Sequence, residues 1–195
     1  GDQDLNILNS VIEDINKLKI NAEIILKSTV LPSNIENIKK LIPRIIYNPE
    51  FLTERSANED FINAEFIVLG GNNKNVSKIS SFYKNHTKCL SNNIIHTDLI
   101  SASLIKYTIN SFLASKVMFF NELNSLFKKS GTDESWENFI QAVSSDSRIG
   151  KSHMQVPGPD GRYGFGGSCF PKDSQAIYKY SLSLNSPLNI LKKVI

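Results

Sequence analysis

Hydrophobic residues in the first half of the chain alternate between helical spacing and short unbroken runs. Helical spacing predicts helices over residues 4–18 and 32–43 and around Val76 to Tyr83, whereas the apolar runs are typical of buried strands. Strands that alternate with helices of about ten residues or more predict βαβ units and a mostly parallel sheet. The expected strands are residues 24–26, 45–47, 65–71 and 93–96.

The pattern changes at Asp98, after which apolar residues keep helical spacing as far as Ser130 without a Pro or a Gly. Gly131 suits the C-cap of this long helix. At about 1.5 Å per residue the helix would be ~45–50 Å long, which is more than a half-domain can cover. Its wide apolar face is therefore expected to meet another subunit or a further domain. The remaining expected elements are a helix around Trp136, a Gly- and Pro-rich loop at 147–168, and helices at 172–184 and from Pro187.

These elements predict an α/β protein, with the C-terminal half of a Rossmann-like parallel sheet followed by a long central helix and an all-α region. We expect a partial nucleotide-binding domain over residues 1–97 and an α-helical domain over residues 98–195. No G-x-G-x-x-G turn occurs in the 195 residues, so the phosphate-binding half of such a sheet is expected to be missing. Parallel sheets carry their working residues at the carboxyl ends of the strands, here in loops that begin at Ser28 and Asn48.

Composition and charge argue against several classes of protein. The 22 Lys and Arg against 19 Asp and Glu leave a net charge of +3 without a basic block, so no nucleic-acid binding is expected. No apolar run approaches the ~18–20 residues that span a bilayer, and neither membrane insertion nor a secretory signal is expected. Two cysteines cannot form a disulfide framework, which favours a cytoplasmic protein. The three histidines lack metal-ligand spacing, so no metal site is expected.

The most informative segment is GRYGFGGSCFPKD, residues 161–173, because its glycines let the backbone approach a ligand closely. Cys169 lies near the start of the following helix, where the helix dipole and Lys172 favour a thiolate, the form that attacks a carbonyl carbon. Asp173 is one helical turn further on and could orient a water or a lysine. The alternative is a buried structural cysteine beside a flexible loop. The glycines and the Lys-Asp pair favour the reactive cysteine, whereas Cys89 has no such surroundings.

Lys106 and Asn110 stand at i, i+4 in the long helix, so both side chains project from one face. They interrupt a stretch that is otherwise apolar. Together they could hold an oxyanion, the lysine by its charge and the asparagine by its amide hydrogen. A solvated helix edge is the alternative, and the spacing alone leaves both open. His153 with Cys169 would be the pair of a cysteine hydrolase, although no orienting acid is evident.

Two loops add further candidates. Glu50 and Glu54 follow directly after an expected strand, and either could act as a general base once desolvated. Thr29 ends the K-S-T turn beyond another strand, where a hydroxyl commonly fixes a ligand or a water. Arg148 is either a cation in a mobile loop or a ligand clamp. Ordinary turn and helix-start roles remain open for the glutamates and the threonine.

Taken in order, several segments resemble the UDP-glucose/GDP-mannose dehydrogenase family. The last of them is highly specific, and its F-P-K-D ending looks like the branch that acts on UDP-glucose. The segments span about three quarters of the chain. They are KSTVLP at 27–32, NPEFLTE at 48–54, the Lys106/Asn110 pair in KYTINSFLASK, DSRIG at 146–150, and GFGGSCFPKD at 164–173.

The resemblance implies an NAD-dependent oxidoreductase that converts UDP-glucose to UDP-glucuronate in two oxidation steps. A cysteine thiolate would hold the intermediate aldehyde as a thiohemiacetal, which is oxidised to a thioester and then hydrolysed. The long helix at 98–130 resembles the family's central helix and implies a homodimer. NAD and the UDP-sugar would be the small-molecule partners.

Carried over position by position, the family's roles fall on sixteen residues of this chain. Those that would act in catalysis are Cys169 as nucleophile, Lys106 and Asn110 at the oxyanion, Asp173 and Thr29 at the catalytic water, and Glu50 as acid/base. Those that would line the UDP-sugar site are Phe51, Leu52, Arg148, Tyr163, Gly164, Phe165 and Gly166, with Arg148 reaching a partner subunit. Those that would face NAD are Ser28, Glu54 and Lys172.

The sequence also departs from the family pattern. The G-x-G-x-x-G half-sheet and the carboxyl-terminal UDP-binding domain are not found in these 195 residues, and Arg55 replaces a glycine that often follows the second Glu. We therefore expect a fragment with little or no dehydrogenase activity alone. The alternatives are a dimerising UDP-sugar-binding module without turnover, or a dehydrogenase for GDP-mannose or UDP-N-acetylmannosamine.

Overall fold

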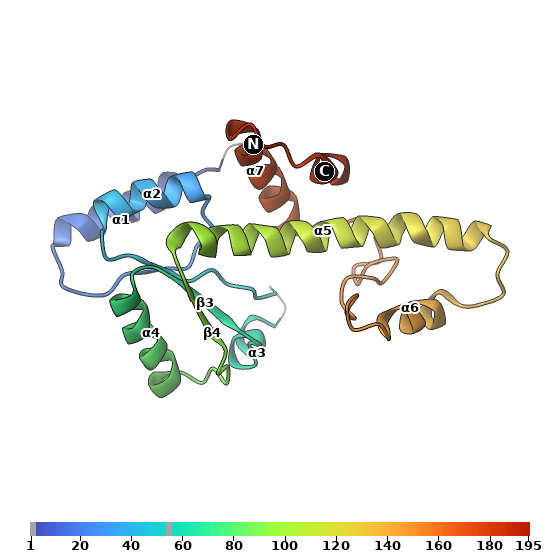
Figure 1. Ribbon diagram of the computed structural model, residues 1–195, viewed down its shortest axis with the longest axis horizontal. Helices are drawn as coiled ribbons and strands as arrows, with labels where there is room; N and C mark the ends of the chain where they lie inside the picture. The colour runs from blue at the N-terminus through green and yellow to red at the C-terminus, as the bar shows by residue number, and fades with distance from the viewer. Residues whose placement is uncertain (1–2, 54–55) are drawn as a thin grey trace. The chain divides into compact units, whose positions relative to one another are not determined.

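The computed structural model describes residues 3–53 and 56–195 and divides into two compact units, residues 2–106 and 107–195. The helix α5 (Leu99–Lys129) begins in the first unit and continues into the second. It is the long green-to-yellow helix of Figure 1, and it confirms the helix predicted at 98–130.

The first unit is a four-stranded sheet in the order β1-β2-β3-β4, covered by helices. β1 pairs with β2 and β3 pairs with β4 in parallel, whereas β2 and β3 are joined in antiparallel by the single pair Tyr47 and Gly70. The mostly parallel sheet predicted from the sequence is therefore confirmed. Its elements are α1 (Asn6–Leu18), β1 (Ile25–Leu26), α2 (Pro32–Leu41), β2 (Ile46–Tyr47), α3 (Ala57–Ile62), β3 (Ile67–Gly70), α4 (Asn73–His86) and β4 (Ile94–Thr97).

Alternation along the strands gives this sheet two apolar faces. The helices α1 and α2 pack against one face and α4 against the other, as Figure 1 shows. The first face buries Leu26, Tyr47 and Val68 against Ile12, Ile35 and Ile38, and the second buries Ile46, Ile67 and Leu69 against Val76, Ile79 and Tyr83. Only α3 was not predicted, because its sequence ANEDFI is too short and polar to show a helical apolar stripe.

Gly70 ends β3 where the first turn of α5 packs against the sheet. A Cβ atom at this position would lie 2.7 Å from Ala102 Cβ and 2.8 Å from the carbonyl oxygen of Asp98. Any larger residue would therefore push α5 away from the sheet. Gly70 at the end of the strand thus has a packing role.

The second unit contains only helices and loops among its described elements. They are the part of α5 from Tyr107 on, α6 (Trp136–Ser144), α7 (Phe170–Ser183) and α8 (Asn189–Val194), which confirms the all-α region. Its core packs Phe120 and Trp136 against Met154 and Val156, two residues of the Gly- and Pro-rich loop. Within residues 3–53 and 56–195, no helix combines the length and apolar character that crossing a bilayer demands.

Candidate active site

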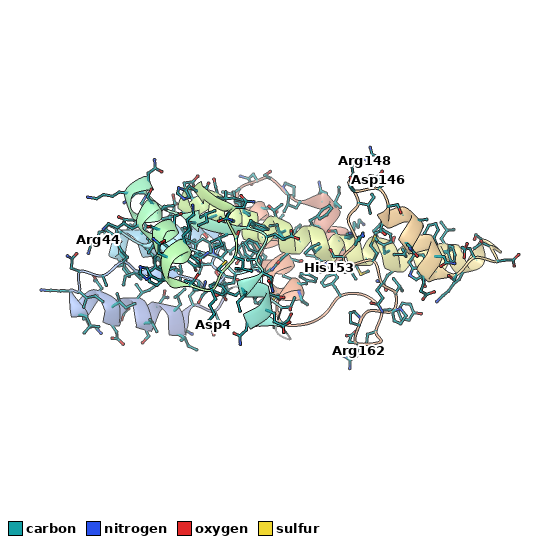
Figure 2. All side chains as sticks on the ribbon, turned by 90° about the horizontal axis from the view of Figure 1, so that it is seen from below. Asp4, Arg44, Asp146, Arg148, His153 and Arg162 are labelled. Carbon is teal, nitrogen blue, oxygen red and sulfur yellow. The ribbon has the colours of Figure 1, made fainter. Side chains whose placement is uncertain are left out.

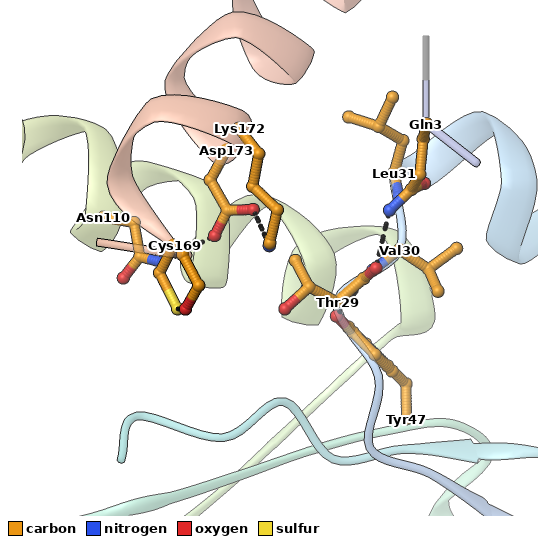
Figure 3. A network of polar contacts seen from close by, with 10 residues as sticks. Gln3, Thr29, Val30, Leu31, Tyr47, Asn110, Cys169, Lys172 and Asp173 are labelled. Carbon is orange, nitrogen blue, oxygen red and sulfur yellow. Dashed lines mark hydrogen bonds and ion pairs between the residues drawn. The ribbon is translucent and has the colours of Figure 1, made fainter. Parts of the chain in front are cut away.

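The loops that follow β1 and β2 carry most of the site residues predicted in the first unit. β1 and β2 are parallel, so Ser28 and Thr29 emerge at the same edge of the sheet as Glu50 and Phe51. The Thr29 carbonyl accepts a hydrogen bond from Gln3 Nε2 at 2.6 Å, which fixes the turn (Figure 3). Ser28 is exposed and Thr29 is partly buried. The sheet therefore presents these side chains together, as parallel strand ends require.

Glu50 forms an ion pair with Lys27. Glu50 Oε1 lies 2.9 Å from Lys27 Nζ, and about two fifths of each side chain is exposed, 41% and 39%. Glu50, Phe51 and Leu52 line a cavity of about 450 Å³ together with Lys27. The general base predicted at this position is therefore a half-exposed carboxylate at the wall of a cavity, with a cation at hydrogen-bond distance.

The loop beyond Glu50 is held by Asp60 of α3. Thr53 donates to Asp60 Oδ2 from its hydroxyl at 2.7 Å and from its backbone N–H at 2.8 Å. These hydrogen bonds, the hydroxyl first, lower the pKa of the Asp60 carboxyl because they stabilise its charged form. Glu54, predicted to face NAD, lies outside the described residues.

Lys106 is buried in the first turns of α5, with its ammonium 5.1 Å from the centre of the Phe51 ring. A cation over an aromatic face at this distance is an attractive contact. The structure thus brings together two residues that the sequence assigned to the site through different motifs. Lys106 was expected to hold the oxyanion, and Phe51 was expected to line the sugar site. The solvated helix edge left open by the sequence does not describe this buried lysine.

Asp173 is the centre of a polar cluster in the second unit. Its side chain is almost fully buried, and Oδ2 accepts a hydrogen bond from Asn110 Nδ2 at 2.6 Å. Oδ1 accepts from Lys172 Nζ at 2.5 Å (Figure 3). A buried carboxylate held by an amide and an ammonium keeps its orientation, which is what a group that positions a water requires.

Cys169 is the N-cap residue of α7, where the sequence places it. The Asp173 backbone N–H donates to the Cys169 carbonyl at 3.0 Å, so one turn of helix links the two residues. Cys169 Sγ lies 3.5 Å from Ser168 Oγ and is partly buried. The ammonium of Lys172 is occupied by Asp173, and its predicted effect on the thiol stays a prediction.

The loop before Cys169 is anchored by side chains of α5. Asn121 Oδ1 accepts from the backbone N–H of Gly164 at 2.8 Å, and Gly164 has a φ of +78°, a conformation that favours glycine. The Phe165 ring packs edge-on against Phe170, with ring centres 6.5 Å apart, and Gly166 is exposed. Most of Tyr163 is exposed, and its hydroxyl accepts from Lys128 Nζ at 3.3 Å.

Lys116 anchors the other end of this loop. Its ammonium donates to the carbonyl oxygens of Ile149 at 3.0 Å and Gly150 at 3.3 Å. Burial lowers the pKa of Lys116, because a less hydrated ammonium is costlier to keep charged. The D-S-R-I-G segment is therefore tied to α5 at the residues that directly follow Arg148.

Arg148 points away from the body of the second unit, beside Asp146 (Figure 2). Its guanidinium lies 2.5 Å from Asp146 Oδ2 and is largely exposed. The ion pair lowers the pKa of Asp146 and raises that of Arg148, because each charge stabilises the other. Of the two roles left open by the sequence, this position of Arg148 favours an exposed cation over a side chain that holds a ligand within its own unit.

His153 is the histidine proposed for a cysteine hydrolase. Its imidazole packs against the Phe170 ring at 5.6 Å, and burial together with the charge of Lys116 lowers its pKa. His153 has a φ of +63°, which is uncommon for a residue with a side chain. Across the part of the chain that the structure describes, no three His, Cys, Asp or Glu side chains gather as a metal site.

The residues that hold these side chains in place were not predicted from the sequence. Lys27 shares an ion pair with Glu50, and Lys116 and Asn121 anchor the glycine-rich loop. Lys27 had a detectable signal, since a lysine directly after a buried strand is at the edge where the site forms. Lys116 and Asn121 showed none, because polar residues on a long helix are ordinary.

Comparison with known proteins gives a consistent result. Two family models match, the UDP-glucose/GDP-mannose dehydrogenase family NAD binding domain over residues 1–87 and the central domain of the same family over residues 100–195. A UDP-glucose 6-dehydrogenase of Rickettsia bellii (strain RML369-C) is 40% identical over 187 residues, which cover 91% of this chain and 41% of that protein.

Two further relatives agree. The UDP-glucose 6-dehydrogenase TuaD of Bacillus subtilis (strain 168) is 35% identical over 151 residues, covering 77% of this chain and 31% of that protein. A solved UDP-glucose dehydrogenase from the hyperthermophilic archaeon Pyrobaculum islandicum is similar with a TM-score of 0.83 at 31% identity, over 99% of this chain and 45% of that chain. The chain spans less than half the length of each of these three relatives.

Proposed function

Because the chain belongs to the UDP-glucose/GDP-mannose dehydrogenase family, we propose that it serves the oxidation of UDP-glucose to UDP-glucuronate through a covalent adduct on Cys169. NAD⁺, when bound, accepts the hydride of each oxidation. Ser28 suits a nucleotide contact, because its exposed hydroxyl stands at the carboxyl end of β1, the edge where such sheets bind nucleotides.

The residues of this chain act on the sugar carbon and on its oxygen. Glu50 takes the proton of the primary alcohol as the aldehyde forms. The Cys169 thiolate then adds to the aldehyde carbon, giving a thiohemiacetal whose oxygen is held by Lys106 and Asn110. Loss of a second hydride turns this adduct into a thioester. Asp173 orients the water that hydrolyses the thioester, which releases the carboxylate and regenerates the thiol.

The observation that carries the proposal is the arrangement at the start of α7. Cys169 occupies the N-cap position of α7, and one turn later the buried Asp173 accepts a hydrogen bond from Asn110. A nucleophile, an amide donor and an oriented carboxylate are three of the groups that thioester formation and hydrolysis use. A structural cysteine would need neither the buried carboxylate nor the lysine beside it.

Alkylation of the 195-residue chain with iodoacetamide tests the sugar site, with the modified cysteines identified by mass spectrometry. We expect UDP-glucose to slow the modification of Cys169 and to leave that of Cys89 unchanged. Both thiols are modified in the same sample, so Cys89 is the internal control. GDP-mannose and UDP-N-acetylmannosamine, added separately, should protect less. Equal labelling of Cys169 with and without UDP-glucose would overturn the proposed substrate, and stronger protection by another nucleotide sugar would replace it.

Catalytic turnover is measured in a separate experiment. We expect little or no NADH at 340 nm from UDP-glucose and NAD⁺ with the 195-residue chain, because no G-x-G-x-x-G turn occurs in it to hold the pyrophosphate. Rapid NADH formation that Cys169→Ser abolishes would overturn that expectation while supporting the proposed reaction. Protection of Cys169 with little or no NADH is the combination that we expect from these 195 residues, and a UDP-sugar-binding module without turnover would give the same combination.

We also propose that α5 forms a homodimer. Phe112, Phe119 and Leu126 recur every seven residues along α5 and are each at least 60% exposed. Side chains at this spacing lie on one stripe of a helix, as in paired helices. We expect light scattering to give the mass of a dimer for the chain and of a monomer for Phe119→Glu. A monomeric wild type at tens of micromolar would contradict the pairing.

A further inference from the structure

The Lys27 ammonium donates hydrogen bonds to two oxygen atoms and forms an ion pair with a third. Nζ lies 2.9 Å from Glu50 Oε1, 3.0 Å from Asn48 Oδ1 and 3.3 Å from Tyr83 OH. The three oxygen atoms belong to residues at the β2 end, in the loop beyond it and in α4. All four residues line the same cavity of about 450 Å³. The lysine is thus held from several sides at the wall of the candidate site.

The orientation of Asn48 is imposed by the sheet. Its Nδ2 donates to the carbonyl oxygen of Val68 in β3 at 2.9 Å, so its Oδ1 must face the opposite way, toward Lys27 and Tyr83. The Tyr83 hydroxyl donates to that same Oδ1 in a short hydrogen bond. Asn48 is 3% exposed and Tyr83 is 7% exposed. The acceptor side of this network is therefore buried and fixed by backbone.

The ion pair between Lys27 and Glu50 is not buried as Asn48 and Tyr83 are. Both side chains are about two fifths exposed, and a pair of this kind gains little energy and holds its geometry poorly in water. The Lys78 and Glu23 pair of the same unit serves as the comparison, with a contact of 2.7 Å and side chains that are 55% and 22% exposed. Lys27 differs from Lys78 in its hydrogen bonds to the buried Asn48 and Tyr83.

We propose that Lys27 is the positioning residue of Glu50, and that Asn48 and Tyr83 position Lys27. The network runs from the β3 backbone through Asn48 to the ammonium, and from the ammonium to the carboxylate that faces the cavity. It fixes where Glu50 stands when it exchanges a proton with the sugar alcohol. The inference rests on the proposed function only for the acid/base role of Glu50.

Zero-length crosslinking of the 195-residue chain tests the geometry without any need for turnover. A water-soluble carbodiimide activates the Glu50 carboxyl, the Lys27 amine displaces the urea, and an amide bond remains. The Lys78–Glu23 amide forms in the same reaction and serves as the internal reference. The ratio of the two crosslinked peptides is measured by mass spectrometry for the wild type and for Tyr83→Phe, which keeps the ring and removes the hydroxyl.

We expect Tyr83→Phe to lower the ratio of the Lys27–Glu50 amide to the Lys78–Glu23 amide about fivefold, as the loss of one hydrogen bond implies. An unchanged ratio in a variant that unfolds at the wild-type temperature would overturn the proposal. If Tyr83→Phe does not fold, Asn48→Asp is used instead, since it keeps Oδ1 for Lys27 and loses the donor to Val68. Its ratio should also fall, and an unchanged ratio counts against the proposal.

Steady-state kinetics separates a positioning role from a purely structural one. Where the wild type forms NADH, we expect Tyr83→Phe to lower kcat about fivefold and to leave KM for UDP-glucose within about twofold, while Lys78→Met changes neither. A rise in KM alone would overturn the role in the chemical step. If the wild type forms no NADH and UDP-glucose does not protect Cys169, the proposed function fails, whereas the crosslink ratio still decides whether Lys27 is positioned.

Discussion

The two loops that carry candidate site residues, one in each unit, are held in different ways. In the first unit, the loop after β2 follows directly from a strand, and the parallel pairing of β1 and β2 decides where Glu50 emerges. The Asp60 side chain holds this loop only farther on, at Thr53. In the second unit, the loop at 147–168 contains no strand or helix and is held by a few side chains. Lys116 and Asn121 bind its backbone, and Met154 is buried in the core.

This difference indicates where single substitutions should act. A loop fixed by a sheet tolerates the loss of one side chain, because the strands still place its ends. A loop fixed by individual anchors loses its position with each anchor that is removed. Substitutions in the two units test this contrast.

Met154→Ala should have the largest effect. Met154 is 1% exposed and packs against Phe120 and Trp136, so truncation leaves a cavity and removes the loop's apolar anchor. We expect the free energy of unfolding to fall by about 3 kcal/mol in urea denaturation. The exposed Leu184→Ala is the control, and a similar loss in both variants would show that the loop is not anchored at Met154.

Asp173→Ala should have the next largest effect on the free energy of unfolding. The change leaves the buried amide of Asn110 without the acceptor it has now, which costs about 2 kcal/mol. Asp173→Asn keeps an acceptor and should cost about half as much. Urea denaturation of both, with the exposed Asp133→Ala as the control, measures the difference. Equal losses for the Ala and Asn variants would contradict the role assigned to the hydrogen bond.

Glu50→Gln should cost less than about 1 kcal/mol, since its ion pair is half-exposed and Lys27 keeps Asn48 and Tyr83 as partners. The same denaturation experiment measures it. A loss as large as that of Asp173→Ala would break the contrast between the two units. It would mean that the loop after β2 depends on its side chains rather than on the sheet.

The smallest effect concerns pH. Burial lowers the pKa of His153 below its ordinary value of 6.5, so the unfolded chain binds a proton at this residue more readily than the folded one. Stability should therefore fall as the pH falls through about 6.5 toward the lower folded value. His153→Asn, which tolerates the positive φ, should remove part of this decline in melting temperature between pH 7.5 and 5.5. Identical slopes in both proteins would contradict the lowered pKa of His153.

The sequence was sufficient to predict most of the helices and strands, for a physical reason. Helices and strands bury one face, so the period of apolar residues reports them directly, and the long helix was predicted to within a residue at each end. The antiparallel pairing of β2 with β3 was not predicted, because strand direction depends on how the connections cross the sheet. The candidate site residues were found through motifs, and their roles remain predictions.

The sequence by itself determined the family, the order of elements and the types of residue available for chemistry, because local periodicity and spacing are properties of the chain. Only the tertiary structure decided which side chains meet. Asp173 accepts from Asn110 across 63 positions, and Lys27 reaches Tyr83 across 56. Such contacts arise where packed elements converge, and spacing along a chain carries no record of distance across a fold.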